Sequence, residues 1–257
     1  MRPALLVFLL IATPVGAARA DSHPTPWLGI ALATGDGPAR VAEVYTGTPA
    51  EAAGLAAGDV IRAVAGVQVA DAAAVIGALQ HRGVGDTVTL RLARSDKERQ
   101  VQVTLAERPD ELALLRSQAL DRPAPAFDLT GAAGRPVRLA DLAGQVVVVE
   151  FWATWCGPCH ETALHLSAWQ DKYGRRGLRV VGVSAEAADV IARYAGKQTL
   201  SYPLAVDRGG VVSRAYHVPA VPTFFVIDRE GVVRYADVGG DRVDAVEEAF
   251  LPLLDGR

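Results

Sequence analysis

Cysteine and methionine are scarce in this 257-residue chain, which has two of the first and one of the second. Two cysteines allow at most one internal disulfide. Both lie in the segment Trp155-Cys156-Gly157-Pro158-Cys159, where a bond would close almost no loop. Such a bond adds little stability, because it hardly constrains the unfolded chain. The pair is therefore better explained by reactivity than by cross-linking of the fold.

Long apolar segments, a strong charge of one sign and hydrolase motifs are also missing. After residue 20, no segment is apolar for long enough to cross a bilayer. The formal net charge of −3 argues against nucleic acid or an anionic membrane surface as the main partner. Neither Gly-x-Ser-x-Gly nor His-Glu-x-x-His occurs, so two common hydrolase signatures are absent. We predict no metal site and no bound cofactor.

Residues 1–20 have the pattern of a secretory signal peptide. Arg2 precedes the apolar run Ala4–Ala12, and Ala18-Arg19-Ala20 is a small-x-small cleavage site. The alternative is an uncleaved membrane anchor, but the run is short and is followed by Pro14 and Gly16. We therefore predict cleavage near Ala20 and export to the periplasm, an oxidising space in which disulfides persist.

Residues 21–107 are predicted to form a small, mainly-β domain with two helices. Thr48-Pro49-Ala50-Glu51 is typical of a helix start, and Asp71 is suited to cap the second helix. Strands are predicted over 60–64, 87–92 and 100–105. The run at 49–61, Pro-Ala-Glu-Ala-Ala-Gly-Leu-Ala-Ala-Gly-Asp-Val-Ile, resembles the core signature of bacterial PDZ domains of the kind carried by HtrA-type proteases.

This resemblance implies a peptide-binding groove. Trp27-Leu28-Gly29-Ile30 is similar to the carboxylate-binding loop of these domains, and the edge strand 30–34 would accept an extended peptide. The second helix would form the other wall. The predicted groove residues are Leu28, Gly29, Ile30, Val75 and Leu79. The partner would be a peptide or a C-terminal segment; the alternative is that Trp27 and Leu28 only fill the core.

Residues 108–122 are predicted to be a linker with a short helical stretch, because prolines stand at both ends. Strands and helices then alternate over residues 123–257. Strands are expected at 146–152 and 178–184, helices at 158–173 and 187–198, a hairpin at 223–227 and 232–236, and a last helix at 242–254. This order predicts a mixed sheet with helices on both faces.

Together with the Cys-Gly-Pro-Cys segment and Val221-Pro222-Thr223, this order resembles the α/β thioredoxin fold. The approach Phe151-Trp152-Ala153 and the opening at 124–129 are similar to exported, membrane-associated reductases of the TlpA/ResA type. The resemblance implies a thiol-disulfide oxidoreductase that reduces protein disulfides. It also implies a membrane thiol-disulfide electron donor and a role in cytochrome c maturation or oxidase assembly.

The residue types around the cysteine pair suggest separate roles. Cys156 begins a predicted helix, where free N–H groups and the helix dipole favour a thiolate, so we predict it to be the nucleophile. Cys159 lies one turn later on an apolar face and is predicted to be the shielded, resolving thiol. Glu150 ends a run of four valines. A raised pKa there would suit a base that takes the proton from Cys159.

The thioredoxin resemblance adds expectations about the surroundings. It implies that Pro222 follows a cis peptide bond and faces the disulfide, with Val221 offering backbone groups to substrate. Trp155 is expected to provide contact surface beside Cys156. Gly157-Pro158 is the thioredoxin dipeptide and implies a reducing pair, near about −270 mV. One departure is that Thr162 stands where these reductases place an acid, with a glutamate one position earlier.

Three alternatives remain open at this point. Cys156–His160 also satisfies the Cys-x-x-Cys-His motif for c-type haem attachment. Because the one methionine is Met1, the second axial ligand would have to be His165 or His217. A second alternative is a peptide-binding adaptor whose cysteine pair is a redox sensor. The third is an oxidant rather than a reductant of protein thiols.

Overall fold

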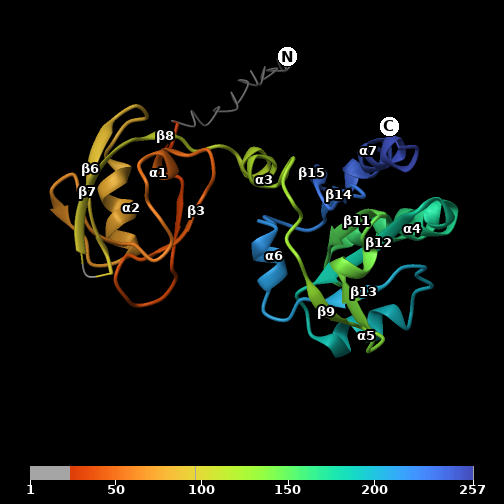
Figure 1. Cartoon of the computed structure of the whole chain (residues 1–257). Coiled ribbons are helices and arrows are strands. Elements are labelled where there is room, and N and C mark those ends of the chain that lie inside the picture. Colours follow the sequence, from red (N-terminus) through yellow and green to blue (C-terminus); the bar gives the residue numbers. More distant parts are fainter. Residues whose placement is uncertain (1–23, 96, 257) are drawn as a thin grey trace, which may run out of the picture.

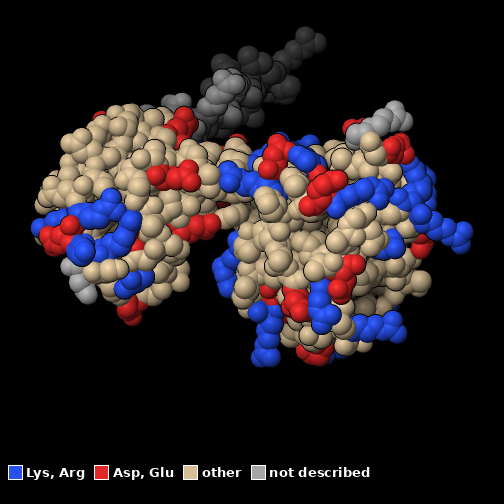
Figure 2. Space-filling model, in the orientation of Figure 1, with Lys and Arg blue, Asp and Glu red and all other residues tan. Residues whose placement is uncertain are grey.

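The computed structural model describes residues 24–95 and 97–256, so the predicted leader lies outside the described residues. Figure 1 shows two lobes, with the helix α3 (Glu111–Ala119) between them. Within the described ranges, no helix combines the length and apolarity needed to cross a membrane. Figure 2 shows acidic and basic residues interspersed over the visible face, without a large area of either sign.

The first lobe is mainly β-structure around one small core. Its four-stranded antiparallel sheet has the order β5-β4-β6-β7, and two further pairs are β2–β3 and β1–β8. The strands are β1 (Pro26–Trp27), β2 (Ile30–Leu32), β3 (Val41–Val44), β4 (Val60–Val64), β5 (Val67–Gln68), β6 (Thr87–Arg94), β7 (Lys97–Thr104) and β8 (Ala106–Glu107). The helices are α1 (Pro49–Ala52) and α2 (Ala72–Gln80).

Both helices of this lobe begin where the sequence predicts. The Thr48 hydroxyl accepts a hydrogen bond from the Glu51 N–H, and the Asp71 carboxylate accepts one from the Ala74 N–H. These caps satisfy N–H groups that have no partner within the helix. Alternate strand residues such as Leu90 and Leu92 point into the core, which confirms the predicted half-buried strands.

The second lobe is a seven-stranded mixed sheet with the order β10-β9-β13-β12-β11-β14-β15. The central strand β11 is parallel to β12 and antiparallel to β14. The strands are β9 (Asp128–Gly131), β10 (Pro136–Arg138), β11 (Val146–Phe151), β12 (Leu178–Ser184), β13 (Leu204–Val206), β14 (Thr223–Ile227) and β15 (Val233–Val238). The α-helices are α4 (Gly157–Tyr173), α5 (Ala188–Ala195), α6 (Val211–Ala215) and α7 (Val243–Leu254).

Helices cover both faces of this sheet, because β11 is apolar on both sides. Val146 and Val148 pack in one cluster with α4 and α7, whereas Val147 and Val149 pack in the other with α3 and α6. The burial of every residue of β11 explains the continuous valine run. The arrangement is the thioredoxin-like fold that the sequence predicted.

The helix α3 differs from the sequence prediction of a linker. Its Leu115 is 1% exposed and belongs to the core of the second lobe. Arg116 donates hydrogen bonds to the Ala236 carbonyl and the Asp237 carboxylate of β15. The helix is therefore part of the second lobe, because burial of its apolar side chain and this ion pair attach it to the sheet.

A small contact joins the two lobes. The Gln118 side chain at the end of α3 accepts a hydrogen bond from the Thr46 N–H and donates one to the Thr46 carbonyl. The His217 ring lies 5.8 Å from the Tyr45 ring, centroid to centroid, and its Nε2 is 3.5 Å from a Glu43 oxygen. The contact with the first lobe thus involves His217, which precedes Pro222 in the second lobe by five residues.

Candidate active site

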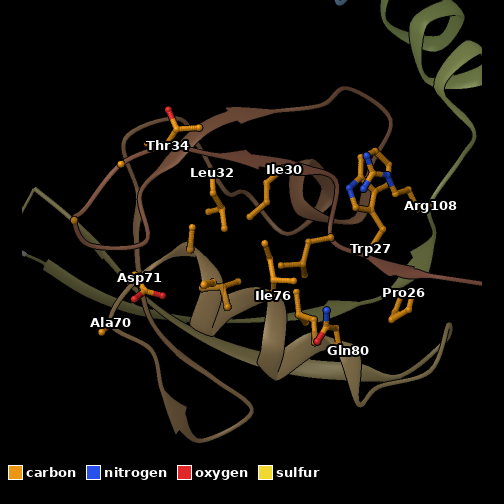
Figure 3. A pocket seen from close by; sticks show the side chains of 18 of the residues that line it. Pro26, Trp27, Ile30, Leu32, Thr34, Ala70, Asp71, Ile76, Gln80 and Arg108 are labelled. Atoms are coloured by element: carbon orange, nitrogen blue, oxygen red, sulfur yellow. The ribbon is translucent and has the colours of Figure 1, made fainter. Parts of the chain in front are cut away.

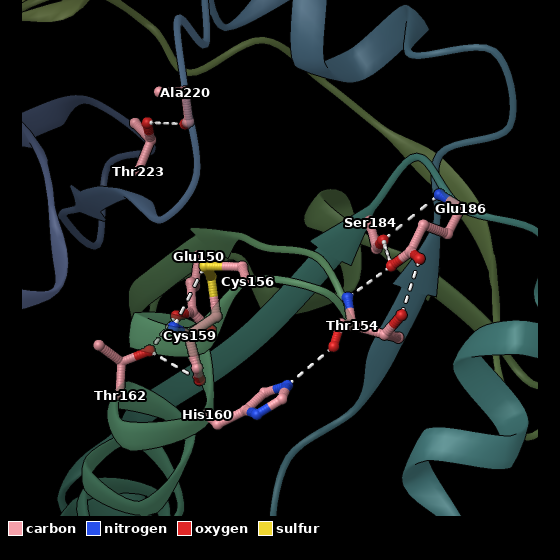
Figure 4. Close-up of a disulfide and its surroundings, with 10 residues drawn as sticks. All are labelled: Glu150, Thr154, Cys156, Cys159, His160, Thr162, Ser184, Glu186, Ala220 and Thr223. Atoms are coloured by element: carbon pink, nitrogen blue, oxygen red, sulfur yellow. Dashed lines mark hydrogen bonds between the residues drawn. A yellow bond between two sulfur atoms is a disulfide. The ribbon is translucent and has the colours of Figure 1, made fainter.

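The two cysteines lie at the junction of β11 and α4, at the end of the central strand. Cys156 is the N-cap of α4, and its Sγ accepts a hydrogen bond of 3.2 Å from the Cys159 N–H. Pro158 stands in the first turn of the helix, where its missing N–H leaves no partner unsatisfied. The cysteines form a disulfide with an S–S distance of 2.05 Å, so the structure represents the oxidised form. Figure 4 shows this bond above the start of α4.

Burial differs sharply between the disulfide and the tryptophan before it. Cys156 is 4% and Cys159 is 1% exposed, whereas Trp155 is 74% exposed. Cys159 belongs to the apolar cluster that includes Leu166 and Trp169 of α4. In the oxidised protein both sulfurs are thus largely covered, and the exposed indole of Trp155 is available as contact surface. The burial of Cys159 agrees with the shielding that the sequence predicts, and the structure covers Cys156 as well.

Glu150 is 1% exposed and is linked to Cys159 through the Thr162 hydroxyl, which is hydrogen-bonded to Glu150 and lies 3.0 Å from the Cys159 carbonyl oxygen (Figure 4). Burial raises the pKa of its carboxyl from the ordinary 4.5 to about 8, although a hydrogen bond from Thr162 opposes this shift. A carboxyl with such a pKa exchanges a proton near neutral pH. Its charge also contributes to the raised pKa of Tyr194 and Tyr202, although burial is the main cause for both.

Thr162 is a site residue whose role the sequence did not predict. Its hydroxyl is hydrogen-bonded to Glu150 Oε1 and lies 3.0 Å from the Cys159 carbonyl oxygen. Thr162 is 1% exposed, while its neighbour Glu161 is exposed and does not reach the buried carboxyl. The only sequence signal was that Thr162 occupies a position where similar reductases carry an acid.

The loop that ends at β14 contains the predicted proline. The Val221–Pro222 peptide bond is cis, which confirms that expectation. The Pro222 carbonyl accepts a hydrogen bond from the Gly239 N–H, and the Thr223 hydroxyl donates one of 2.6 Å to the Ala220 carbonyl. Val221 packs against the apolar cluster that contains both cysteines. These two hydrogen bonds and the packing of Val221 therefore hold the loop in place.

A polar clamp holds the segment that leads to Cys156. The Glu186 carboxylate accepts hydrogen bonds of 2.6 and 2.8 Å from the Thr154 N–H and hydroxyl. The His160 Nε2 is 2.8 Å from the Thr154 carbonyl oxygen, and the His160 ring lies 5.3 Å from that of Tyr194. His160 thus faces this turn (Figure 4). The sequence did not single out Glu186, because nothing local links it to Thr154.

The groove in the first lobe has a volume of 1030 Å³ and lies between β2 and α2 (Figure 3). Four of the predicted residues, Leu28, Ile30, Val75 and Leu79, line it. The fifth, Gly29, has a φ of +88°, and a Cβ there would lie 2.2 Å from the Thr48 Cβ, so only glycine fits. Val75 is 1% exposed and also belongs to the core.

Among the residues that the structure describes, no strand pairs with the edge of β2 that faces this groove. On the other edge, Gly29 accepts a hydrogen bond from the Tyr45 N–H, and the Ala33 N–H donates to the Arg40 carbonyl. Because hydrogen-bonding groups alternate along an antiparallel strand, those of Ile30 and Leu32 point towards the groove. An extended peptide could therefore pair with this edge.

Comparisons with known proteins find a matching family for each of the two lobes. The family model of the AhpC/TSA family matches residues 120–236, and that of the PDZ domain matches residues 26–105. A protein named thiol-disulfide oxidoreductase ResA from Bacillus thuringiensis subsp. konkukian is 32% identical over 133 residues, 51% of this chain and 76% of the relative. One of the same name from Geobacillus kaustophilus is 33% identical over 122 residues, 47% and 70% of the two chains.

The second lobe is also similar to a solved structure from Chlorobium tepidum that is described as a candidate thiol:disulfide interchange protein DsbE. It is 34% identical, with a TM-score of 0.50, and the match covers 53% of this chain and 99% of that one. The region that the AhpC/TSA family model matches, residues 120–236, contains the cysteine pair, the buried acid and the cis-proline loop. The chain therefore belongs to the ResA family of thiol-disulfide oxidoreductases, with a PDZ domain before its thioredoxin-like domain.

Proposed function

We propose that the protein is an exported reductant of protein disulfides in which Cys156 attacks and Cys159 resolves. The Cys156 thiolate attacks a substrate disulfide, forms a mixed disulfide with one sulfur and releases the other, which takes up a proton. Cys159 then loses its proton and attacks Cys156 Sγ, which releases the second substrate thiol and closes the disulfide. The main support is the placement of Cys156 at the N-cap of α4, where N–H groups stabilise a thiolate.

Glu150 is proposed to take the proton from Cys159 during the second step. Its raised pKa supports this role, because a carboxylate that ionises near pH 8 is a stronger base than an ordinary glutamate. Pro222 and Val221 are proposed to hold the substrate chain beside the disulfide, with Trp155 as further contact surface. The return reaction needs a donor dithiol, which we propose to be a membrane electron donor.

The reduction potential tests the direction of electron flow. The Gly157-Pro158 dipeptide between the cysteines supports a potential near about −270 mV. It is measured by equilibrating the purified protein with glutathione or dithiothreitol buffers and quantifying free thiols. A value close to about −120 mV would instead make the protein an oxidant of thiols.

Export to the periplasm is part of the same proposal. It is supported by the signal-peptide pattern of residues 1–20 and by the need of disulfide substrates for an oxidising space. A role in cytochrome c maturation rests on the family resemblance alone. The redox-sensing adaptor predicts instead that a Cys156→Ser/Cys159→Ser protein keeps its cellular role.

The groove of the PDZ domain is proposed to recruit a C-terminal segment of a substrate or partner. Figure 3 shows Trp27 and Arg108 at one end, Asp71 at the other and the apolar Ile30 and Ile76 between them. The cation of Arg108 suits a terminal carboxylate next to the Leu28–Ile30 loop. We therefore propose a ligand with an apolar last residue and a basic residue upstream.

Replacing Ile76 with aspartate is expected to weaken peptide binding more than about tenfold, because a ligand would then cover an unpaired charge. Ile76 lines the groove yet is 52% exposed, so the fold should tolerate the change. The probe is a fluorescein-labelled peptide that begins Lys-Lys and ends Val-Ala-Val with a free carboxylate, measured by fluorescence polarisation. The matched control is Val67→Asp, which changes a residue 56% exposed outside the groove. Equal affinities of the two variants would contradict the groove assignment.

A further inference from the structure

Thr162 lies between the buried carboxyl of Glu150 and a polar hollow at the surface. The hollow has a volume of 200 Å³ and lies beside the start of α7. Thr162 is the buried polar member of its lining, and its hydroxyl also contacts Glu150. The other lining residues are Glu161, His165, Gly240, Asp241, Val243 and Asp244. Thr162 is therefore in contact with both the enclosed acid and the hollow at the surface.

The single proton of this hydroxyl has two acceptors within reach. When Glu150 is ionised, the Thr162 O–H donates to the carboxylate. When Glu150 is protonated, its own O–H donates to Thr162 Oγ1, and the Thr162 O–H turns to the Cys159 carbonyl at 3.0 Å. Both protonation forms thus keep a full set of hydrogen bonds at this side chain. The bond to the charged form is the stronger of the two, so the hydroxyl favours ionisation.

We infer that Thr162 is a positioning residue that sets the pH at which Glu150 exchanges the proton of Cys159, and that its hydroxyl passes this proton to solvent in the hollow. The inference rests on the proposed role of Glu150 as proton acceptor. When the disulfide closes, Cys159 gives its proton to Glu150. Glu150 then gives a proton to Thr162 Oγ1 while the hydroxyl proton moves to water. When a donor dithiol reduces the pair, the same steps run in reverse.

Other titratable groups surround this path. Tyr194 of α5 and Tyr202 face Glu150, and burial is the main cause of their raised pKa. Glu161 and His165 of α4, Asp241 and Asp244 face the hollow from the exposed side. All of these groups remain when Thr162 is replaced by valine, which has the same shape without the hydroxyl. The difference between the two proteins therefore isolates the hydroxyl.

The test is a stopped-flow reaction of the fully reduced protein with 5,5′-dithiobis(2-nitrobenzoate). Attack by Cys156 releases the first thionitrobenzoate, and resolution by Cys159 releases the second. In Thr162→Val the pH midpoint of the second phase should rise by about one unit, which slows this phase about tenfold at pH 7. The first phase should be unchanged, and Thr162→Ser should restore the second. A carbon-13 NMR titration of the Glu150 carboxyl should show the same shift.

Three outcomes would overturn the inference. If the second phase had the wild-type rate and pH midpoint in Thr162→Val but was slow in Glu150→Gln, the role of Thr162 would be contradicted. The proposed mechanism would remain intact. An equally slow second phase in Thr162→Ser and Thr162→Val would show that the hydroxyl is not what matters. An unchanged second phase in Glu150→Gln would remove the proposed role of Glu150 and the inference with it.

Discussion

Replacing Glu150 with glutamine is expected to remove a large pH dependence from the stability of the oxidised protein. In the folded protein burial raises the pKa of this carboxyl to about 8, whereas in the unfolded chain it ionises near 4.5. Between pH 4.5 and pH 8, the Glu150 carboxyl has therefore released its proton in the unfolded state but retains it in the folded state. The free energy of unfolding therefore falls as the pH rises through this window. The loss amounts to about 4 kcal/mol by pH 8.

Glutamine keeps the shape of the protonated carboxyl and cannot ionise. Wild type and Glu150→Gln should therefore be similarly stable near pH 4, and the variant should be the more stable protein at pH 8. Urea denaturation of both oxidised proteins across this range measures the effect. The control is Glu248→Gln on α7, an exposed glutamate whose replacement should leave the pH dependence unchanged. Parallel pH profiles for wild type and Glu150→Gln would contradict the burial argument.

Local sequence patterns were sufficient to predict the elements that carry the cysteine pair. The valine run predicted β11 to within one residue, and Cys156 at a helix start predicted α4 to within one residue. Both predictions succeeded because burial of β11 on two faces requires an unbroken apolar run, and the helix start has its own chemistry. The strand Thr223–Ile227 was predicted with its observed bounds for the same reason.

Contacts between distant segments were not predictable in this way. The sequence predicted a short helical stretch within the linker 108–122, but not that its Leu115 packs in the core of the second lobe with residues of β15. Glu186 is 32 residues from Thr154, and the two meet only because β11 and β12 are neighbours in the sheet. The His217 side chain contacts Glu43 and Tyr45 of the other lobe, which no local pattern indicates.

Thr162 shows a second reason why the sequence did not predict the whole site. Because it follows Cys159 by three residues, it lies near the buried face of α4. A threonine at such a position is commonly just a packing residue. Only the hydrogen bond to Glu150 distinguishes it. The cis bond before Pro222 was predicted from family resemblance, since the local sequence alone does not favour it.

The alkylation rates of the two thiols test the central claim most directly. In the reduced protein, Cys156 at the N-cap of α4 should react with iodoacetamide with a pH midpoint below the ~8.5 of a free cysteine. Cys159 lies inside α4, away from the N–H groups that stabilise a thiolate at Cys156, and should react at least about 100-fold more slowly at pH 7. The modified peptides are quantified by mass spectrometry over time. Equal and slow alkylation of both thiols at pH 7 would contradict the account.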